Sequence, residues 1–322
     1  MKPLVTVAIT TYHSALYILE TLDSIYEQTY ENIALVVSDD GSTDNTIALV
    51  NQWLSEGNHA QRFKSVEVIT VPINTGVSAN CNRCIAAAPS DWLKYIAGDD
   101  ILLPDCIADN VSFIQQNPEA NIIFSQVKIY QDTFEEENYV RTMPLNFPEN
   151  IMSAKLTAAD QYQLLLLSDR INYTPSSFVN KQIQINIGGF DETNRLVEDY
   201  PMWLQLTNSG QKLFYFHKPT VGYRIHSKAA NNVSDDVIFK PSALNSFPVR
   251  KAFAHPFLPW EIVRSEYHVY WISKIFQKNG WNKNRKRNKK LYHFASFYLN
   301  PFYYIFAIKK RLPANQNNPF YF

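Results

Sequence analysis

Cysteine is scarce in this chain of 322 residues, which contains only Cys81, Cys84 and Cys106. Three cysteines do not support a disulfide framework, and the Cys81-x-x-Cys84 pair has neither a second pair nor a histidine cluster beside it. The pair falls within an expected helix. We therefore interpret both residues as small buried side chains rather than as zinc ligands or a redox centre.

An excess of charge of either sign is also absent. Lys and Arg together number 30, Asp and Glu together number 30, and the net charge at pH 7 is +0. A chain without a global positive field is not expected to recruit nucleic acid. The N-terminal Met1-Lys2-Pro3 enters the first expected strand directly, so we expect no signal peptide and a cytoplasmic protein.

Two glycine-rich phosphate-binding motifs are missing as well. No Gly-x-Gly-x-x-Gly follows the first expected strand, which argues against a dinucleotide-binding dehydrogenase, and no Gly-x-x-x-x-Gly-Lys loop occurs. The chain instead alternates apolar strands, at residues 4–11, 33–37 and 66–71, with amphipathic helices. This alternation predicts an α/β fold with a mostly parallel sheet.

Two of the expected strands end in paired carboxylates. Asp39-Asp40 follows the strand at 33–37, and Asp99-Asp100 follows another apolar strand at 92–97. Because the carboxyl ends of parallel strands meet at one edge of a sheet, the two pairs should lie together where ligands bind. Grouped carboxylates repel each other unless a cation or hydrogen-bond donors meet them. The sequence therefore indicates a binding site at this edge.

The Asp39-Asp40-Gly41-Ser42 segment and the opening strand from Val5 to Tyr12 resemble the start of family-2 glycosyltransferases. Further matches extend to about His226. Members of this family are inverting enzymes of the GT-A fold that use nucleotide-activated sugars. The resemblance implies a GT-A domain at residues 1–228, with a Rossmann-like, mostly parallel sheet flanked by helices. A mainly helical C-terminal region would follow at residues 229–322.

The resemblance also implies a site for a nucleotide-sugar donor, with a UDP-sugar as the expected one. Asp39 would accept a hydrogen bond from the N–H of the base. Cys81 stands where many members carry an arginine, and Arg83 either replaces that contact or is a polar residue at a helix start. The residues that we expect around the donor are Thr10, Tyr12, Asp39, Asp40, Ser42, Asn74, Gly76, Asn82, Arg83, Asp100 and Arg224.

A metal site is implied in the same way. The family motif is Asp-x-Asp followed by a further Asp, and Ala97 occupies its first acidic position here. Asp99 is then the main expected protein ligand for Mn²⁺ or Mg²⁺, with the donor's diphosphate completing the coordination. His226 resembles the family histidine that completes the metal site or touches the diphosphate. Carboxylate, imidazole and phosphate ligands suit either ion.

A further acidic pair, Glu198-Asp199, precedes an expected helix at residues 200–206. In the family, a pair in this place carries the catalytic base, whereas helix capping alone would also favour acidic residues there. We take Asp199 as the base and Glu198 as its alternative, and we expect the helix dipole to lower the pKa of Asp199. Residues 174–177 and 188–192 should face the acceptor, a hydroxyl of a glycan or lipid-linked saccharide used in polysaccharide or cell-envelope synthesis.

Two other functions stay open. Ala97 would suit a non-catalytic sugar-nucleotide-binding module of the same fold. A sugar-nucleotide nucleotidyltransferase would release pyrophosphate, although its usual glycine-rich loop is missing between Thr10 and His13.

The C-terminal region combines basic and aromatic residues. Six Lys and Arg residues lie between 282 and 290, an uncharged aromatic-rich run spans 291–308, and Lys309-Lys310-Arg311 follows. This pattern fits either an interfacial helix on the inner face of the cytoplasmic membrane or a helix packed on the catalytic domain. We also expect loops at residues 132–150 and 231–249.

Overall fold

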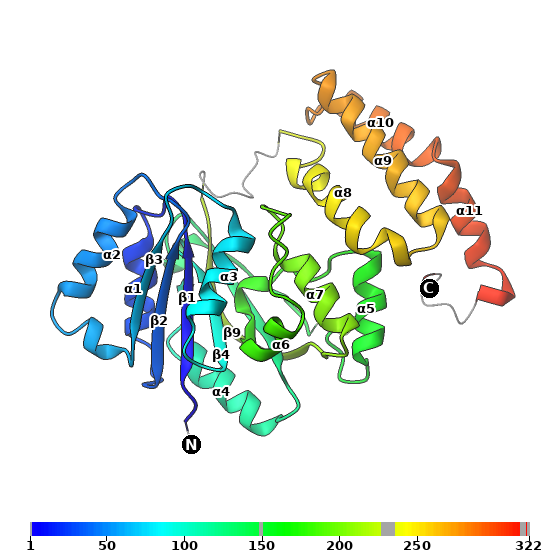
Figure 1. The fold of residues 1–322 in the computed structure, drawn as a ribbon. Helices are drawn as coiled ribbons and strands as arrows, with labels where there is room; N and C mark the ends of the chain where they lie inside the picture. The colour runs from blue at the N-terminus through cyan, green and yellow to red at the C-terminus, as the bar shows by residue number, and fades with distance from the viewer. Residues whose placement is uncertain (1, 148–150, 227–235, 316–319, 321–322) are drawn as a thin grey trace. The chain divides into compact units, whose positions relative to one another are not determined.

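The computed structural model describes residues 2–147, 151–226, 236–315 and 320. The chain separates into two compact units (Figure 1). The first unit comprises Met1–Tyr162 and Arg170–His226, and the second comprises Gln163–Asp169 and Ser227–Phe322.

A single mixed sheet forms the centre of the first unit. Its parallel half has the order β3-β2-β1-β4, built from β1 (Val5–Thr11), β2 (Ile33–Asp39), β3 (Val66–Thr70) and β4 (Trp92–Ala97). The sheet continues through β8 (Phe178–Asn180), β6 (Ile122–Gln131), β9 (Phe214–Ile225) and β5 (Ile101–Leu102). In this half β6 and β9 are parallel, whereas β8 is antiparallel to both β4 and β6.

The helices of the chain lie between and after these strands. Helix α3 packs on β1 and β2, and α1 packs on α2. In chain order the helices are α1 (Ile18–Tyr26), α2 (Thr46–Ser55), α3 (Val77–Ala87), α4 (Cys106–Gln116), α5 (Ala158–Leu167), α6 (Lys181–Asn186), α7 (Asp199–Asn208), α8 (Pro241–Phe253), α9 (Trp260–Lys278), α10 (Lys286–His293) and α11 (Pro301–Lys310).

The register of the parallel strands positions the site. Thr11 of β1 lies opposite Asp39 of β2, and Thr10 of β1 lies opposite Ala97 of β4. The three strands therefore end level with one another, which confirms the prediction that the two Asp-Asp pairs emerge at one edge. All seven residues of β2 are buried, as the β-branched run predicts for a central parallel strand.

The interpretation of Cys81 and Cys84 as buried side chains is confirmed. Cys81, Cys84 and Cys106 are buried and form no disulfide. Thr157 and Asp160 form a reciprocal capping box at the start of α5: the Thr157 N–H donates to Asp160 Oδ2 at 2.8 Å, and the Asp160 N–H donates to Thr157 Oγ1 at 3.2 Å.

The loop predicted at residues 132–150 is wrong for its middle part. Residues Tyr139–Met143 form β7, an edge strand that pairs antiparallel with β6, and residues 148–150 lie outside the described part of the chain. Tyr139, Val140 and Arg141 are exposed, so the ladder bonds to β6 rather than burial hold this strand. Such a strand leaves no apolar alternation in the sequence.

The loop predicted at residues 231–249 is also wrong where it can be tested. Residues 241–249 belong to α8, which begins at a proline, a residue well suited to the first turn of a helix. Residues 231–235 lie outside the described residues. Strand β9 runs through Pro219, because irregular register with β6 accommodates the proline.

In the second unit, α11 and α10 both pack on α9. The uncharged run at 291–308 is not one helix, because Asn300 and Pro301 separate the π-helix Phe294–Tyr298 from α11. Within the described residues, no helix combines the length and the apolar character needed to cross a bilayer.

Candidate active site

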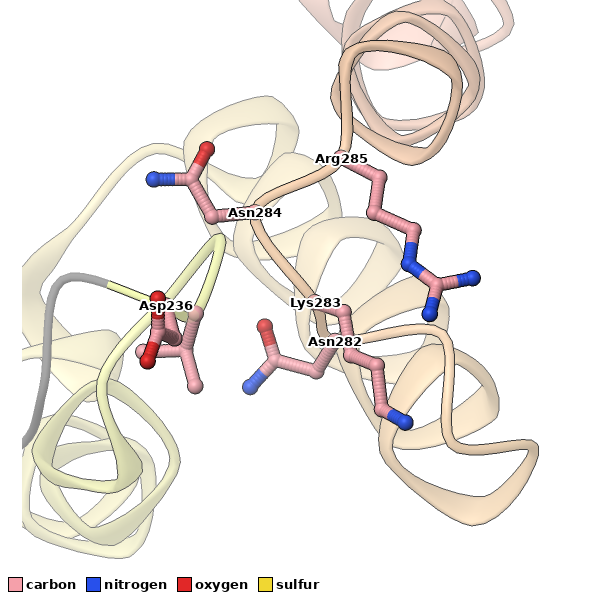
Figure 2. A pocket seen from close by; sticks show the side chains of 6 residues that line it. Asp236, Asn282, Lys283, Asn284 and Arg285 are labelled. Carbon is pink, nitrogen blue, oxygen red and sulfur yellow. The ribbon is translucent and has the colours of Figure 1, made fainter.

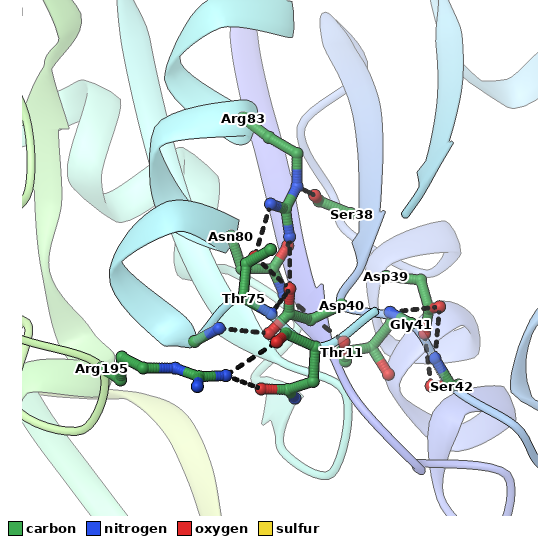
Figure 3. Close-up of polar contacts among 12 residues, drawn as sticks. Thr11, Ser38, Asp39, Asp40, Gly41, Ser42, Thr75, Asn80, Arg83 and Arg195 are labelled. Carbon is green, nitrogen blue, oxygen red and sulfur yellow. Dashed lines mark hydrogen bonds and ion pairs between the residues drawn. The ribbon is translucent and has the colours of Figure 1, made fainter. Parts of the chain in front are cut away.

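Asp40 is a buried anchor at the edge of the sheet (Figure 3). Its Oδ1 accepts hydrogen bonds from the Thr75 N–H at 3.0 Å and the Thr75 hydroxyl at 2.6 Å, and its Oδ2 accepts from the Gly76 N–H at 2.8 Å. Arg83 Nη2 lies 2.7 Å from Oδ1. Burial disfavours the carboxylate, but the bonds from Thr75, Arg83 and Gly76 outweigh burial and hold the pKa of Asp40 below its usual value.

Arg83 is the cation that meets the first acidic pair. Besides Asp40, its guanidinium donates to Thr75 Oγ1 at 2.9 Å and to Asn80 Oδ1 at 3.1 Å. Figure 3 shows these contacts around one guanidinium. With its side chain 20% exposed, Arg83 braces the loop that follows β3 from within the protein.

Asp39 organises the turn after β2. Its Oδ2 accepts hydrogen bonds from the Gly41 N–H at 3.1 Å and the Ser42 N–H at 2.8 Å, and its Oδ1 accepts one from the Ser42 hydroxyl. Gly41 has a φ of +80°, and a Cβ there would lie 2.8 Å from the Ile73 carbonyl carbon. Only glycine fits this turn.

Thr10 and Tyr12 lie at the same edge. The Thr10 carbonyl accepts a hydrogen bond from the Gly98 N–H at 3.0 Å, which ties β1 to the turn before Asp99. Tyr12 is exposed, and its ring stacks on His13 with centroids 4.0 Å apart. An exposed aromatic ring is a surface on which a planar base can stack.

The sequence did not predict a role for Arg195, which holds the loop that contains Asn74 and Gly76. Its guanidinium donates to the Asn74 carbonyl at 2.7 Å and to Asn74 Oδ1 at 2.9 Å (Figure 3). Gly76 has a φ of +102°, and a Cβ there would lie 2.9 Å from the Arg195 Cβ. Nothing local in the sequence signals this contact between distant segments.

Asn82 binds the glycine loop expected on the acceptor side. Its Nδ2 donates to the Phe190 carbonyl at 2.9 Å and to Glu192 Oε1 at 2.8 Å, and its Oδ1 accepts from the Phe190 N–H at 2.8 Å. A Cβ at Gly189 would lie 2.6 Å from Asn82 Oδ1. Asn82 thus couples α3 to this loop.

Asp99 and His226 lie in direct contact. His226 Nε2 is 3.0 Å from Asp99 Oδ2, and the Tyr17 ring lies 4.5 Å from the imidazole. The Asp99 side chain is 29% exposed, so it remains accessible to a ligand. No cluster of three or more His, Cys, Asp or Glu side chains suited to a metal occurs in the described part of the chain. One carboxylate and one imidazole therefore lie side by side here.

Asp100 and Arg224 have structural partners instead. Asp100 is buried and accepts a hydrogen bond from the Arg224 N–H at 2.9 Å, and burial, followed by the Asp99 charge, raises its pKa well above the usual value. The Arg224 side chain is only 1% exposed; it donates to the Asp99 and Asp132 carbonyls and pairs with Glu20. Arg224 thus supports the Asp99 backbone and has almost no surface for direct donor contact.

The Glu198-Asp199 pair begins α7. Burial, followed by the Asp199 charge, raises the pKa of Glu198 from 4.5 to about 8. Burial also raises the pKa of Asp199, despite hydrogen bonds from Thr174 Oγ1 at 3.0 Å and the Tyr200 N–H at 2.8 Å. The expectation that the helix dipole lowers the Asp199 pKa is therefore wrong, because desolvation outweighs the dipole.

Lys94 contacts the turn that presents Thr174, a role that the sequence analysis did not predict. Its side chain is fully buried in β4, and its Nζ donates to the Pro175 carbonyl at 2.6 Å and to the Ser177 carbonyl at 3.3 Å. Burial lowers the pKa of Lys94 to about 8. A lysine inside an apolar strand stands out in the sequence. Its partners, however, are backbone carbonyls of a distant segment, which no residue pattern identifies.

The sequence model described as glycosyl transferase family 2 matches residues 6–187. The chain belongs to this family. An uncharacterized glycosyltransferase of Rickettsia typhi is 23% identical over 288 residues, which cover 88% of this chain and 83% of the relative.

Solved structures resemble this chain in fold over nearly its whole length. Residues 1–349 of TarS from S. aureus in complex with UDP give a TM-score of 0.54 at 18% identity, covering 96% of this chain and 82% of that one. The mannosyltransferase PcManGT from Pyrobaculum calidifontis, in complex with GDP-Man and Mn²⁺, gives 0.50 at 16% identity, covering 98% and 78%. The chain spans only 54% of a longer TarS structure. These likenesses confirm the predicted GT-A fold.

A separate hollow of about 440 Å³ lies in the second unit of this family-2 protein (Figure 2). It is lined by Asp236, Val237, Asn282, Lys283, Asn284 and Arg285. None of the residues expected to bind donor or metal lines it.

Proposed function

We propose that the protein transfers a sugar from a nucleotide diphosphate donor, a UDP-sugar, to a hydroxyl of a glycan or lipid-linked saccharide. The level ends of β1, β2 and β4 are the observation that carries this proposal, because they place Asp39-Asp40 and Asp99 at one edge. Related folds add support: TarS has been solved with UDP and UDP-GlcNAc, and PcManGT with GDP-Man. We infer that this acceptor is used in the synthesis of a polysaccharide or of the cell envelope.

In this proposal Asp39 accepts a hydrogen bond from the nucleotide base. Its present partners, the Gly41 and Ser42 N–H groups and the Ser42 hydroxyl, hold the carboxylate at the edge of the sheet. Asn74 and Gly76, fixed by Arg195 and Asp40, shape the loop beside it. Tyr12 offers its exposed ring to the base.

Asp99 and His226 would hold a divalent ion, Mn²⁺ or Mg²⁺, together with oxygens of the donor's diphosphate. Their side chains lie 3.0 Å apart, and a carboxylate with an imidazole is a donor set that suits these ions. The ion, when bound, would neutralise charge on the leaving diphosphate. Arg224 and Glu20 keep the Asp99 backbone in place beneath this pair.

Inversion in one displacement needs a carboxylate that removes the acceptor proton as the new bond forms. We assign this role to Asp199. Its hydrogen bonds from Thr174 and Tyr200 stabilise the ionised form, whereas Glu198, with a pKa near 8, stays protonated at neutral pH. A carboxylate with a raised pKa is also a stronger base than an exposed one.

The test combines donor screening with an isosteric substitution. Purified protein is mixed with a panel of nucleotide sugars and Mn²⁺, and release of nucleoside diphosphate is measured. We expect Asp199→Asn to lower kcat by roughly 10²–10⁴-fold, the usual span for loss of a general base, and to leave UDP affinity unchanged in calorimetry. Asp91→Asn, at an exposed aspartate, is the control.

The other outcomes identify the rival functions. Release of pyrophosphate would make the protein a nucleotidyltransferase. Tight donor binding by the wild type with no release under any metal condition would make it a binding module.

A further inference from the structure

Charge is strongly segregated along this electrically neutral chain. The last 56 residues, 267–322, contain 11 of the 30 Lys and Arg residues and none of the 30 Asp and Glu residues. The rest of the chain therefore carries an excess of negative charge. A segment of this charge should attract an anionic surface.

Helix α10 and the π-helix after it expose a stripe of apolar side chains next to a cluster of basic residues. Leu291 in α10, and Phe294, Phe297 and Tyr298 in the short π-helix Phe294–Tyr298 that follows it, are each exposed and recur at intervals of three or four residues. Asn288 and Ser296, in the same two segments, are buried. Lys286, Arg287, Lys289 and Lys290 precede the stripe and are exposed as well.

Helix α11 repeats the pattern in reverse order. Tyr304, Ile308 and Leu312 are exposed at intervals of four residues, and the exposed Lys310 and Arg311 lie at the C-terminal end. The other face of α11 packs on α9, where the Phe302 ring meets the Trp260 ring edge-on at 6.2 Å. Basic residues therefore flank an apolar centre at both ends of the segment 286–312.

We propose that these two exposed stripes on α10 and α11, the C-terminal amphipathic surface, bind the interface of an anionic lipid bilayer. Aromatic side chains favour the headgroup region of a bilayer, and basic residues beside them attract anionic lipids. A single-stranded nucleic acid would use aromatic rings for stacking, but it gives no role to exposed Leu291, Ile308 and Leu312. Lys283 and Arg285, on the rim of the hollow in Figure 2, extend the same basic cluster.

Flotation with vesicles tests this surface directly. The full chain should float with vesicles of phosphatidylcholine mixed with phosphatidylglycerol and stay behind with phosphatidylcholine alone. Recovery should fall as salt rises from about 0.05 M to about 0.5 M, because the screening length shortens over this range. The assay contains no donor or acceptor. Its failure would therefore leave the proposed glycosyl transfer untouched.

Matched variants separate charge from apolar contact. Replacing both Lys289 and Lys290 by Gln should lower the partition coefficient about tenfold or more, since each basic residue near an anionic surface contributes a factor of about five. Phe294→Ser combined with Phe297→Ser should also lower it. Lys64→Gln with Lys155→Gln, and Tyr139→Ser with Leu145→Ser, change exposed residues of the first unit and should bind as the wild type does.

Three results would overturn the proposal. They are equal recovery with neutral and anionic vesicles, no recovery with either, and recovery that neither pair of C-terminal substitutions reduces. Binding of an RNA oligonucleotide without vesicle binding would assign the surface to nucleic acid. Formation of a dimer that Phe294→Ser with Phe297→Ser abolishes, without vesicle binding, would assign it to a second copy of the chain.

Discussion

Asp39 and Asp40 are adjacent, yet their surroundings give them different tasks. Asp40 receives four hydrogen bonds from within the protein, one of them from a cation, so its charge is satisfied without any ligand. Within the described parts of the chain, the Asp39 carboxylate accepts bonds only from its own turn. Both side chains are buried, so the difference between them lies in their partners: Asp40 is held by other segments and a cation, whereas Asp39 is held within its own turn.

Asp40→Ala should destabilise the protein by about 3 kcal/mol, because Arg83 and two backbone N–H groups would lose their partner in a buried setting. Urea unfolding measures the loss. Arg83→Met should cost a comparable amount, and the double variant should cost less than the sum of both. Wild-type stability in Asp40→Ala would contradict the anchoring role.

Asp39→Ala should instead weaken the binding of the ligand. Loss of a hydrogen bond from the base to a charged group is expected to weaken UDP binding by roughly 1–3 kcal/mol in calorimetry. Ser42→Ala provides the comparison, since it removes one partner of the carboxylate and keeps the carboxylate itself. Unchanged UDP affinity in Asp39→Ala would remove the residue from its proposed role.

Glu198 should make the stability of the folded protein depend on pH. Its pKa is about 8 in the folded chain, against 4.5 for an ordinary glutamate, so the folded state keeps a proton that the unfolded state releases. The contribution of Glu198 to stability therefore falls as pH rises through this window and stays low above it. Glu198→Gln cannot titrate and lacks this slope.

The melting temperature of Glu198→Gln should thus exceed that of the wild type by a margin that widens from about pH 5 to about pH 9. Glu119→Gln, at an exposed glutamate, controls for the loss of a carboxylate. A margin independent of pH would refute the prediction. If Glu198→Gln is inactive while Asp199→Asn turns over normally, the two acidic residues exchange roles.

At the scale of elements, the short turn Thr174–Ser176 connects the sheet to the proposed base. Lys94, from β4, holds the carbonyls of Pro175 and Ser177, and Thr174 Oγ1 reaches Asp199 from the same turn. Lys94 does not touch the acceptor in this scheme. It is a positioning residue that acts through Thr174.

Lys94→Met should lower kcat about tenfold or more and leave the donor KM unchanged, because the turn would lose two hydrogen bonds that fix the Thr174 hydroxyl. Lys181→Met is a close control: Lys181 Nζ also donates to a backbone carbonyl, that of Ala88, but it does not contact the turn. If Lys94→Met lowers the melting temperature but leaves kcat and its pH profile unchanged, Lys94 has only a structural role.

The elements differ in how much the sequence reveals of them. Strands β1 and β2 follow from β-branched runs, because burial on both faces requires such residues, and β4 follows from a mostly apolar run. Strand β7 is exposed and depends on pairing with β6, so its composition resembles that of a loop. The Asp-Asp pairs could be placed from strand ends alone, whereas the contacts of Arg195 and Lys94 join segments far apart and leave no local pattern.

At the scale of the whole molecule, the proposed site and the excess of basic residues belong to different units. The residues proposed for donor, metal and base all lie between Thr10 and His226, in the first unit. The basic excess lies after residue 266, in the second. A net charge of +0 therefore conceals two oppositely charged parts, and it supplies no long-range repulsion between molecules.

Such a molecule should associate with copies of itself at low ionic strength, since the basic segment of one copy attracts the acidic part of another. Light scattering at pH 7 should decrease as salt rises from about 0.02 M to about 0.3 M, where the screening length falls to a few ångströms. Lys289→Glu with Lys290→Glu should weaken the association strongly. Lys64→Glu with Lys155→Glu alters the net charge equally but leaves the C-terminal segment intact, so it should weaken association less. Scattering that instead grows with salt would show that the exposed apolar stripes, rather than charge, drive contact between molecules.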